Sequence, residues 1–120
     1  TISDTNQIAD AVVRARATHV VSENERVREA AKCLQAGDVQ GFGLLMNESH
    51  ESLRSNFAVS TEQMDDAVKQ SQALPGVYGA RMTGGGFGGC MVMVVDSDAR
   101  LPENDNTWRV RAVGGAAIIS

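Results

Sequence analysis

The glycines of this chain are concentrated in one short stretch, and that stretch constrains the fold more than any other feature. Seven of the twelve glycines in the 120-residue sequence lie between Gly76 and Gly89. Glycine loses much conformational entropy on folding and is retained where the backbone needs a positive φ or where another group approaches it closely. Val77–Met82 precedes the run and Cys90–Val95 follows it, and both segments are rich in apolar residues. Two strands joined by such a connection predict an antiparallel β-hairpin.

The segments after the glycine run extend the expected sheet. Cys90–Val95 is apolar on both faces, which predicts a central strand covered on both sides. Asp96–Asn106 is polar and rich in Pro, Asn and Asp, so we expect a loop there rather than a good helix. Trp108 and Val110 alternate with arginines, which predicts a final strand continuing towards Ile118.

The region before the hairpin has the periodicity of helices. Ser3–Ala36 is predicted to form one long helix, because apolar side chains recur at alternating spacings of four and three residues. This stripe is expected to face the core and consists of Val13, Ala17, Val20, Asn24, Val27, Ala31 and Leu34. Asn24 lies in the middle of the stripe, so we expect it to fix the register or to hydrogen-bond a neighbouring element.

Two shorter helices are expected to follow. Gly37–Asp38 suits the end of the first helix and the N-cap of the next. Gly41 and Gly43 weaken that second helix, and such glycines usually mark close packing against another backbone. The side chains that it is expected to bury are Phe42, Leu45, Met46, Ser49 and Leu53. Ser60–Gln63 forms a capping-box pattern that opens a third helix, and Pro75–Gly76 ends it.

The composition excludes several classes of protein. Eleven basic against fifteen acidic residues give a net charge of −4 and a pI near 5.0, so no basic excess is available for nucleic acid or an anionic membrane. No apolar run approaches the roughly 18 residues of a membrane span, and we expect no signal peptide. Cys33 and Cys90 are too few for a disulfide framework and are expected to be small buried side chains. We therefore expect a single cytoplasmic α+β domain over residues 1–120.

The glycine run is the strongest candidate for a functional site. Consecutive glycines leave a row of backbone N–H groups unshielded, and such a concavity suits anions such as phosphate. The candidate residues are Thr83, Gly84, Gly85, Gly86, Phe87, Gly88 and Gly89. The run lacks the Gly-Lys-Ser/Thr of a Walker A loop and the helix that follows a dinucleotide fingerprint. A plain flexible turn therefore stays open as the alternative.

Side chains elsewhere give weaker signals. Arg81 lies just before the glycine run, where it would contact a phosphate or another domain, or else be a simple charge on the sheet surface. His19 and His50 have no Glu or Cys arranged as co-ligands, so we expect packing histidines rather than catalytic ones. The residues alone predict no catalytic group and no metal site.

The glycine run also carries a resemblance to a known family. Gly79–Cys90 closely resembles the third motif of galactokinases, which belong to the GHMP kinase superfamily. Other galactokinase-like segments occur in the family's order: Arg16–Val27, Gly41–Leu53, Val59–Asp65 and Val110–Ala116. The likeness covers about residues 12–118, and several motifs in order are more specific than one glycine loop.

The resemblance implies the C-terminal domain of a galactokinase, with a ferredoxin-like, mostly antiparallel sheet packed against helices. The family transfers the γ-phosphoryl group of ATP to the C1 hydroxyl of galactose with the help of Mg²⁺. The segments that mainly bind ATP, Mg²⁺ and galactose form the family's N-terminal domain, which is absent from this sequence. Thr83–Gly89 would then form part of the nucleotide and sugar cleft, and the isolated chain is expected to be inactive.

Two other functions stay open. A galactokinase-like sugar sensor or interaction module without enzymatic activity would share nearly all of this sequence. A generic nucleotide-binding fragment is disfavoured by the length of the resemblance. In a galactokinase-like chain the face that meets the missing domain would be exposed and partly apolar, so we expect self-association through it.

Overall fold

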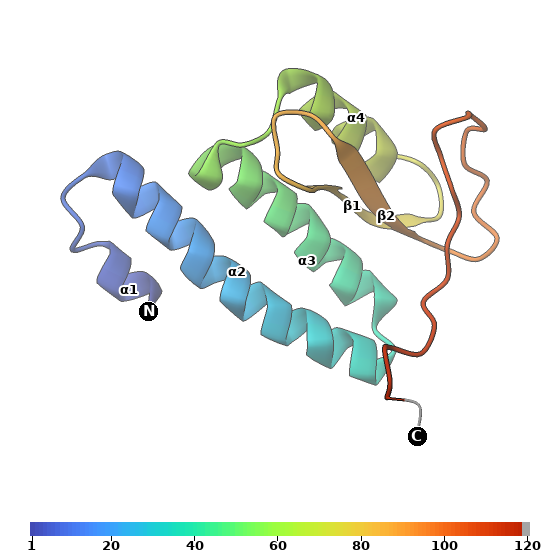
Figure 1. Cartoon of the computed structure of the whole chain (residues 1–120), viewed down its shortest axis with the longest axis horizontal. Helices are drawn as coiled ribbons and strands as arrows, with labels where there is room; N and C mark the ends of the chain where they lie inside the picture. The colour runs from blue at the N-terminus through green and yellow to red at the C-terminus, as the bar shows by residue number, and fades with distance from the viewer. Residues whose placement is uncertain (119–120) are drawn as a thin grey trace.

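The fold combines helices with a β-hairpin. The computed structural model describes residues 1–118, which form α1 (Ile2–Thr5), α2 (Ala11–Ala36), α3 (Val39–Ser52), the π-helical turn η1 (Leu53–Phe57), α4 (Glu62–Gln72), β1 (Val77–Thr83) and β2 (Cys90–Val95). Figure 1 shows α3 between α2 and the hairpin, and α4 packs against β1. The expected α+β class, with an antiparallel sheet against helices, is confirmed. Across residues 1–118 no helix is both long and apolar enough to cross a membrane.

The hairpin forms where the sequence predicted it. β1 and β2 pair antiparallel, with Thr83 opposite Cys90 beside the glycine run and Val77 opposite Val95 at the far end. The buried apolar core lies next to this hairpin and is at most 8% exposed: Met46, Val68, Ala80 and Met82. The glycine run is therefore attached to the best-packed part of the chain.

The outer edge of β1 is closed by side chains. Asn47 Oδ1 accepts the N–H of Ala80 at 2.9 Å, and His50 Nδ1 accepts the N–H of Met82 at 3.3 Å. Gln72 Nε2 donates to the carbonyl of Ala80 at 3.1 Å. Because buried backbone groups need such partners, α3 and α4 together provide the hydrogen bonds that a neighbouring strand would otherwise provide.

The prediction that Cys90–Val95 is a doubly covered central strand is wrong. Within residues 1–118 the sheet has two strands, so β2 lies at an edge, and Cys90 and Val92 are exposed. The predicted strand from Trp108 towards Ile118 is also wrong, because this segment has no regular structure and Trp108 is 76% exposed. An apolar sequence indicates which residues favour burial, but it does not supply the layer that covers them.

The long N-terminal helix is divided in two. The prediction of one helix over Ser3–Ala36 is wrong, because a short turn separates α1 from α2. Asp10 is the N-cap of α2, and its carboxylate accepts the N–H groups of Val12 and Val13 at 2.9 Å. This local hydrogen bonding favours a new helix start over a continuous helix. The helix ends at Gly37 as predicted, with a left-handed φ of 71°.

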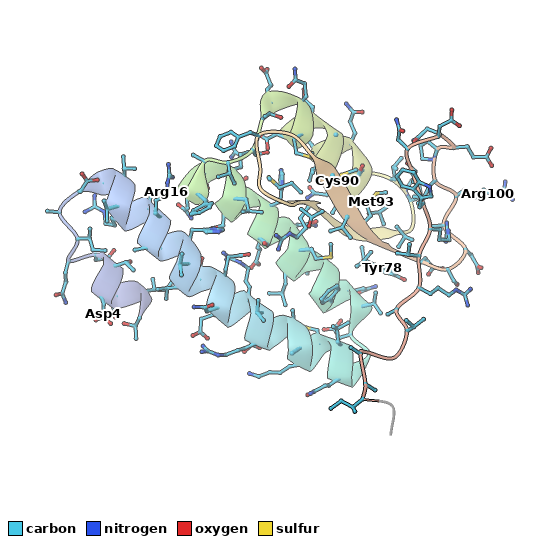
Figure 2. All side chains as sticks on the ribbon, viewed as in Figure 1. Asp4, Arg16, Tyr78, Cys90, Met93 and Arg100 are labelled. Carbon is cyan, nitrogen blue, oxygen red and sulfur yellow. The ribbon has the colours of Figure 1, made fainter. Side chains whose placement is uncertain are left out.

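The prediction that the apolar stripe of α2 faces the core is wrong as well. The large side chains of the stripe are 52–67% exposed: Val13, Val20, Val27 and Leu34. The buried residue of α2 is His19, which is 7% exposed. Figure 2 shows Arg16 on the side of α2 that faces η1, where its guanidinium donates to the carbonyl of Asn56. The polar side of α2 therefore meets its neighbours through hydrogen bonds to η1 and α3, whereas Val27, Ala31 and Leu34 border an open groove.

The predictions for α3 are confirmed. Asp38 caps the helix by accepting the N–H of Gly41 at 2.8 Å. Its predicted inner face is buried or half-buried throughout: Phe42, Leu45, Met46, Ser49 and Leu53. Gly43 packs against the backbone of Tyr78, and Gly79 packs against Gly43, so neither position has room for a Cβ. These glycines let α3 lie directly on β1.

α4 starts one residue later than the capping pattern indicated. Thr61 rather than Ser60 is the N-cap, and its hydroxyl accepts the N–H of Met64 at 3.2 Å. Ser60 instead donates to Asp65 at 2.6 Å. The turn after α4 is the predicted one, with Gly76 at a φ of 80°. Ser60 is thereby free to help fix the connection on which the glycine run lies.

Candidate functional site

The glycine run forms a loop with a backbone that few other residues adopt. It connects Thr83, the last residue of β1, to Cys90, the first residue of β2. Positive φ angles occur at five of its residues: Gly84 (91°), Gly86 (89°), Phe87 (59°), Gly88 (122°) and Gly89 (99°). A Cβ crowds the backbone in this region of φ. The shape of the loop therefore favours glycine at four positions: Gly84, Gly86, Gly88 and Gly89.

The centre of the loop is docked on the connection between η1 and α4. The N–H of Phe87 donates to the carbonyl of Val59 at 2.6 Å. A Cβ at Gly86 would lie 2.5 Å from the carbonyl oxygen of Val59 and 2.7 Å from its Cβ, so only glycine fits. Ala58, before Val59, is itself left-handed with a φ of 56°. The loop is thus held at a defined place, which a plain flexible turn would not be.

The remainder of the loop is open. A Cβ at Gly84, Gly85 or Gly88 would meet nothing within 4 Å. In the part of the chain that the structure describes, Phe87 is the only residue of Gly84–Gly89 whose N–H has a hydrogen-bond partner. Consecutive N–H groups in left-handed and turn conformations make concavities that bind anions. The loop therefore combines a fixed centre with unpaired donors on either side.

Phe87 combines two features that do not favour stability. A left-handed φ at a residue with a Cβ costs about 1–3 kcal/mol, and the ring is 75% exposed. The loop is therefore anchored by the N–H of Phe87 and not by its ring. Strain of this kind clusters at functional sites, so the exposed ring is a candidate contact for a ligand or another domain.

Arg81 lies in a polar network inside the domain. Its Nη1 donates to Ser49 Oγ at 2.8 Å and lies 3.6 Å from Glu23 Oε2. Its Nε donates to the carbonyl of Met82 at 3.0 Å, and Ser49 also donates to Glu23 at 2.6 Å. Arg81 thus ties β1 to α2 and α3. A contact between Arg81 and phosphate or another domain stays a prediction.

Glu23 is the acidic centre of this network. Burial alone would raise the pKa of its carboxyl group, but hydrogen bonds from Ser49 and Arg26 and the charges of Arg26 and Arg81 lower the pKa below its ordinary value. Arg26 Nε lies 2.5 Å from Glu23 Oε1. Glu23 is therefore ionised at neutral pH and compensates two guanidinium groups.

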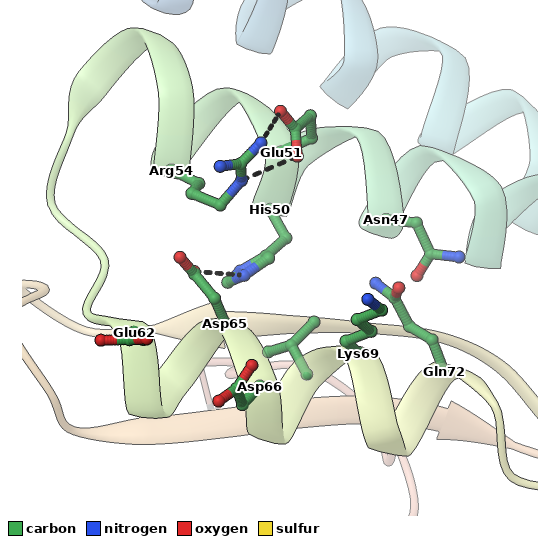
Figure 3. A pocket seen from close by; sticks show the side chains of 10 residues that line it. Asn47, His50, Glu51, Arg54, Glu62, Asp65, Asp66, Lys69 and Gln72 are labelled. Atoms are coloured by element: carbon green, nitrogen blue, oxygen red, sulfur yellow. Dashed lines mark hydrogen bonds and ion pairs between the residues drawn. The ribbon is translucent and has the colours of Figure 1, made fainter.

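A polar pocket of about 560 Å³ lies between α3 and α4. Figure 3 shows His50 of α3 pointing towards Asp65 of α4, with Nε2 and Oδ1 3.1 Å apart. Because Nδ1 accepts the N–H of Met82, we assign the proton to Nε2, which donates to Asp65. Both ring nitrogens hold elements of the fold together, which agrees with the predicted packing role. Among residues 1–118 no three His, Cys, Asp or Glu side chains are grouped to hold a metal ion.

His19 has a packing role too. Its Nδ1 lies 2.9 Å from Ser52 Oγ, and its ring stacks on Phe57 with centroids 4.6 Å apart. Asn56 Nδ2 donates to the same Ser52 Oγ at 3.2 Å, and which of Ser52 and His19 donates to the other depends on the tautomer of the ring. Burial lowers the pKa of His19, and the charge of Glu23 opposes this shift. The ring is therefore neutral at pH 7.

Three residues that position the loop were not among the candidates. Val59 accepts from the loop, and Asn47 and Gln72 hold the outer edge of β1. These contacts join segments far apart in the sequence, so no local pattern reveals them. For Val59 and Asn47 the available signal was their place in galactokinase-like segments.

Comparison with known proteins agrees with this picture. The profile of the family described as GHMP kinases C terminal matches residues 30–103. A galactokinase of Roseiflexus sp. (strain RS-1) is 55% identical over 84 residues, and a galactokinase of Homo sapiens is 52% identical over 84 residues. Both alignments cover 70% of this chain, but only 22% and 21% of the relatives. The chain thus spans about a fifth of the length of these relatives.

The fold is also similar to a solved structure. The crystal structure of Lactococcus lactis galactokinase complexed with galactose matches with a TM-score of 0.75 and 38% sequence identity. The similarity covers 79% of this chain and 26% of that protein. Sequence similarity and structural similarity therefore both point to galactokinases.

Proposed function

The chain belongs to the GHMP kinases through their C-terminal domain, and from this premise we propose that it forms part of the active-site cleft of a cytoplasmic galactokinase. Such an enzyme transfers the γ-phosphoryl group of ATP to the C1 hydroxyl of galactose. The loop Thr83–Gly89 borders the nucleotide and sugar on one side, and the rest of a longer protein completes the cleft. The galactokinases to which the chain is similar, one of them complexed with galactose, support this choice of substrate.

The observation that carries the proposal is the row of unpaired N–H groups beside a fixed loop centre. Gly84, Gly85 and Gly88 have open space around them, while Gly86 and Phe87 are docked on Val59. Phosphoryl transfer places negative charge on phosphate oxygens, and donors already in position stabilise this charge without rearrangement. The loop is suited to that task because Gly84, Gly85 and Gly89 are exposed and the N–H of Phe87 is bonded to Val59.

The loop suits phosphate better than it suits a metal ion. It offers hydrogen-bond donors and contains no carboxylate, whereas Mg²⁺ prefers carboxylate and water oxygens. We therefore assign the phosphates of ATP to this loop and the main Mg²⁺ ligands to other parts of a full-length enzyme. When bound, Mg²⁺ neutralises charge on the phosphates.

An activity assay tests whether the isolated chain can catalyse the reaction without the rest of a full-length enzyme. The isolated chain supplies only part of the cleft, so a coupled ADP-release assay with galactose should give no turnover above background. Turnover that survives further purification would contradict the proposal. A sugar-sensing or interaction module would use the same surfaces, and turnover by the full-length protein distinguishes an enzyme from such a module.

A titration tests the loop itself. Adding inorganic triphosphate to the isotope-labelled chain should shift the NMR amide signals of Gly84–Gly89 and leave those of α2 unchanged. Gly86→Val should abolish the response, because its side chain cannot fit against Val59. Gly85→Ala is the matched control, since its φ is not in the left-handed region and a Cβ there meets nothing. Shifts spread over the whole chain, or equal responses of the two variants, would contradict the assignment.

A further inference from the structure

Asp65, in the first turn of α4, accepts two hydrogen bonds from outside its own helix. Its oxygen Oδ1 accepts the hydroxyl of Ser60 at 2.6 Å and the N–H of His50 Nε2 at 3.1 Å. A carboxyl oxygen has two lone pairs, so this single atom can accept both hydrogen bonds. Figure 3 shows His50 on α3 and Asp65 on α4 directed towards each other. One oxygen atom therefore joins the connection before α4 to α3.

The hydrogen bond from Ser60 acts on the carbonyl that holds the centre of the glycine loop. The carbonyl of Val59 belongs to the planar peptide group that links Val59 to Ser60. Its oxygen accepts the N–H of Phe87 at 2.6 Å. Because Ser60 is tied to Asp65, rotation of this peptide group is restricted and the carbonyl stays directed at the loop. Asp65 thus holds the centre of the loop through Ser60.

The hydrogen bond from His50 acts on the strand that leads into the loop. His50 is 6% exposed, and its Nδ1 accepts the N–H of Met82 at 3.3 Å. Met82 precedes Thr83, the last residue of β1, so this bond holds the strand directly before the first glycine of the loop. The direction of Nδ1 depends on the orientation of the ring, which the hydrogen bond between Nε2 and Asp65 sets. Asp65 therefore also holds the entry to the loop.

The backbone at this place is strained and needs such support. Phe87 and Ala58 have left-handed φ angles of 59° and 56°, although both carry a Cβ. Strained conformations persist only where the surrounding structure over-determines them. Ala58 directly precedes Val59, so the two strained residues lie at the donor and acceptor ends of the hydrogen bond that docks the loop. The hydrogen bonds to Asp65 support that same contact.

We propose that Asp65 is a positioning residue of the anion-binding loop, which it holds at the centre through Ser60 and at the entry through His50. This inference rests on the proposed function, because it concerns how Gly84–Gly89 is kept in the shape that presents its N–H groups to phosphate. Donors that are held in place before phosphate arrives need no ordering on binding, which favours affinity. Loss of Asp65 therefore weakens phosphate binding, although Asp65 acts on phosphate only through other residues.

A simpler role for Asp65 would be to stabilise the start of α4 by its charge. Acidic side chains in the first turn of a helix interact favourably with the helix dipole, and both Glu62 and Asp65 lie there. Asp65→Asn separates the two roles, because asparagine keeps an acceptor oxygen and removes the charge. Positioning of the loop needs the oxygen, whereas stabilisation through the dipole needs the charge.

NMR of the isotope-labelled chain tests the proposal through amide exchange and through titration with inorganic triphosphate. Asp65→Ala should raise the exchange rate of the Phe87 amide, and the dissociation constant for triphosphate, at least about fivefold each. It should also speed exchange at Met82 more than at Ala80, whose N–H is held by Asn47 instead. Asp65→Asn should keep the rate at Phe87 and the dissociation constant within about twofold of wild type. Equal effects of Asp65→Ala and Asp65→Asn would overturn the proposal.

Asp10→Ala is the matched control for loss of stability. Asp10 also accepts two hydrogen bonds, at 2.9 Å each, but these support the start of α2 and not the loop. The variant should weaken the fold and leave the dissociation constant for triphosphate within about twofold of wild type. An equal loss of triphosphate affinity in Asp10→Ala and Asp65→Ala would mean that general destabilisation causes the loss, and the proposal would be wrong.

Ser60→Ala tests one arm of the arrangement and serves in place of Asp65→Ala where that variant does not fold. It removes the hydrogen bond from Ser60 and leaves the one from His50. Exchange at Phe87 should become at least about fivefold faster, while the Nε2–H signal of His50 and the ratio of the Met82 and Ala80 rates stay as in wild type. Unchanged exchange at Phe87 would overturn the proposal.

The titration separates failure of this inference from failure of the proposed function. A wild-type chain that does not respond to triphosphate would overturn the phosphate site and the inference that rests on it. A wild-type chain that binds triphosphate, together with an Asp65→Ala chain that binds it equally well, would leave the phosphate site standing and overturn only the role of Asp65.

Discussion

The hairpin with its two helices and the outer face of α2 carry similar apolar patterns, but they differ in what covers them. Met82 on β1 and Val68 on α4 are each 1% exposed, because α3, α4 and β1 close around them. Val27 and Leu34 on α2 are 67% and 60% exposed, because they border an open apolar groove between α2, α3 and β2. A periodic apolar pattern thus predicts that a face exists, and the neighbouring elements decide whether it is buried.

The largest expected effect comes from truncating one large side chain in each region. Met82→Ala should lower the free energy of unfolding by about 2–5 kcal/mol, because it leaves a cavity in the closed part of the molecule. Leu34→Ala should change it by less than about 0.5 kcal/mol when the chain is monomeric, because its side chain is already largely in water. Denaturant unfolding at low protein concentration measures both. Similar losses of unfolding free energy for the two variants would contradict the distinction between the closed region and the exposed face of α2.

The glycine loop provides the second test. Much of the loop is exposed, but Gly86 and Phe87 are docked on Val59 and so attach it to the closed region. Gly86→Val should lower the free energy of unfolding by about 3 kcal/mol, through a clash with Val59 and a strained φ. Gly85→Ala should be nearly neutral, since nothing lies within 4 Å of its Cβ. Thermal unfolding of both variants gives the answer. Equal midpoints for wild type and Gly86→Val would show that the loop is not held by Val59.

The sequence predicted the closed region better than the open one. The hairpin and its loop follow from local signals, since Gly84–Gly89 and the flanking strands are adjacent in the chain. The break before Ala11 was missed because Asp10 decides it through two hydrogen bonds. The burial of His19 instead of the stripe depends on Ser52, which is distant in sequence. Contacts between residues distant in the sequence do not appear in the hydrophobic periodicity of the sequence.

The hydrogen bonds at the outer edge of β1 give a third, smaller effect. Asn47→Ala leaves the N–H of Ala80 without its acceptor, which should lower the free energy of unfolding by about 1.5 kcal/mol. Glu48→Ala is the control, because Glu48 is the next residue on α3 and is exposed. It should stay within about 0.5 kcal/mol of wild type. A neutral Asn47→Ala would mean that this edge does not depend on side chains.

The smallest expected effect is the pH dependence of the free energy of unfolding that comes from His19, which lies on α2 but is buried. Burial lowers the pKa of His19 below its ordinary 6.5, so the unfolded chain takes up a proton at higher pH than the folded chain. The stability that neutral His19 contributes is therefore complete above pH 6.5 and is lost as the pH falls from there through the folded pKa. Unfolding curves over this range should show the loss, and His19→Gln should reduce it. The same pH dependence in both proteins would place its origin elsewhere.

Residue-resolved hydrogen exchange tests the contrast between the closed and open regions most directly. The amides of Ala80 and Met82 should exchange only when the whole domain opens, because Asn47 and His50 hold them in the closed region. The amides of residues 110–118 should exchange at nearly unprotected rates, since this segment has no regular structure and is exposed. Fast exchange at Ala80 and Met82, or strong protection across 110–118, would contradict the division of the molecule into a closed and an open region.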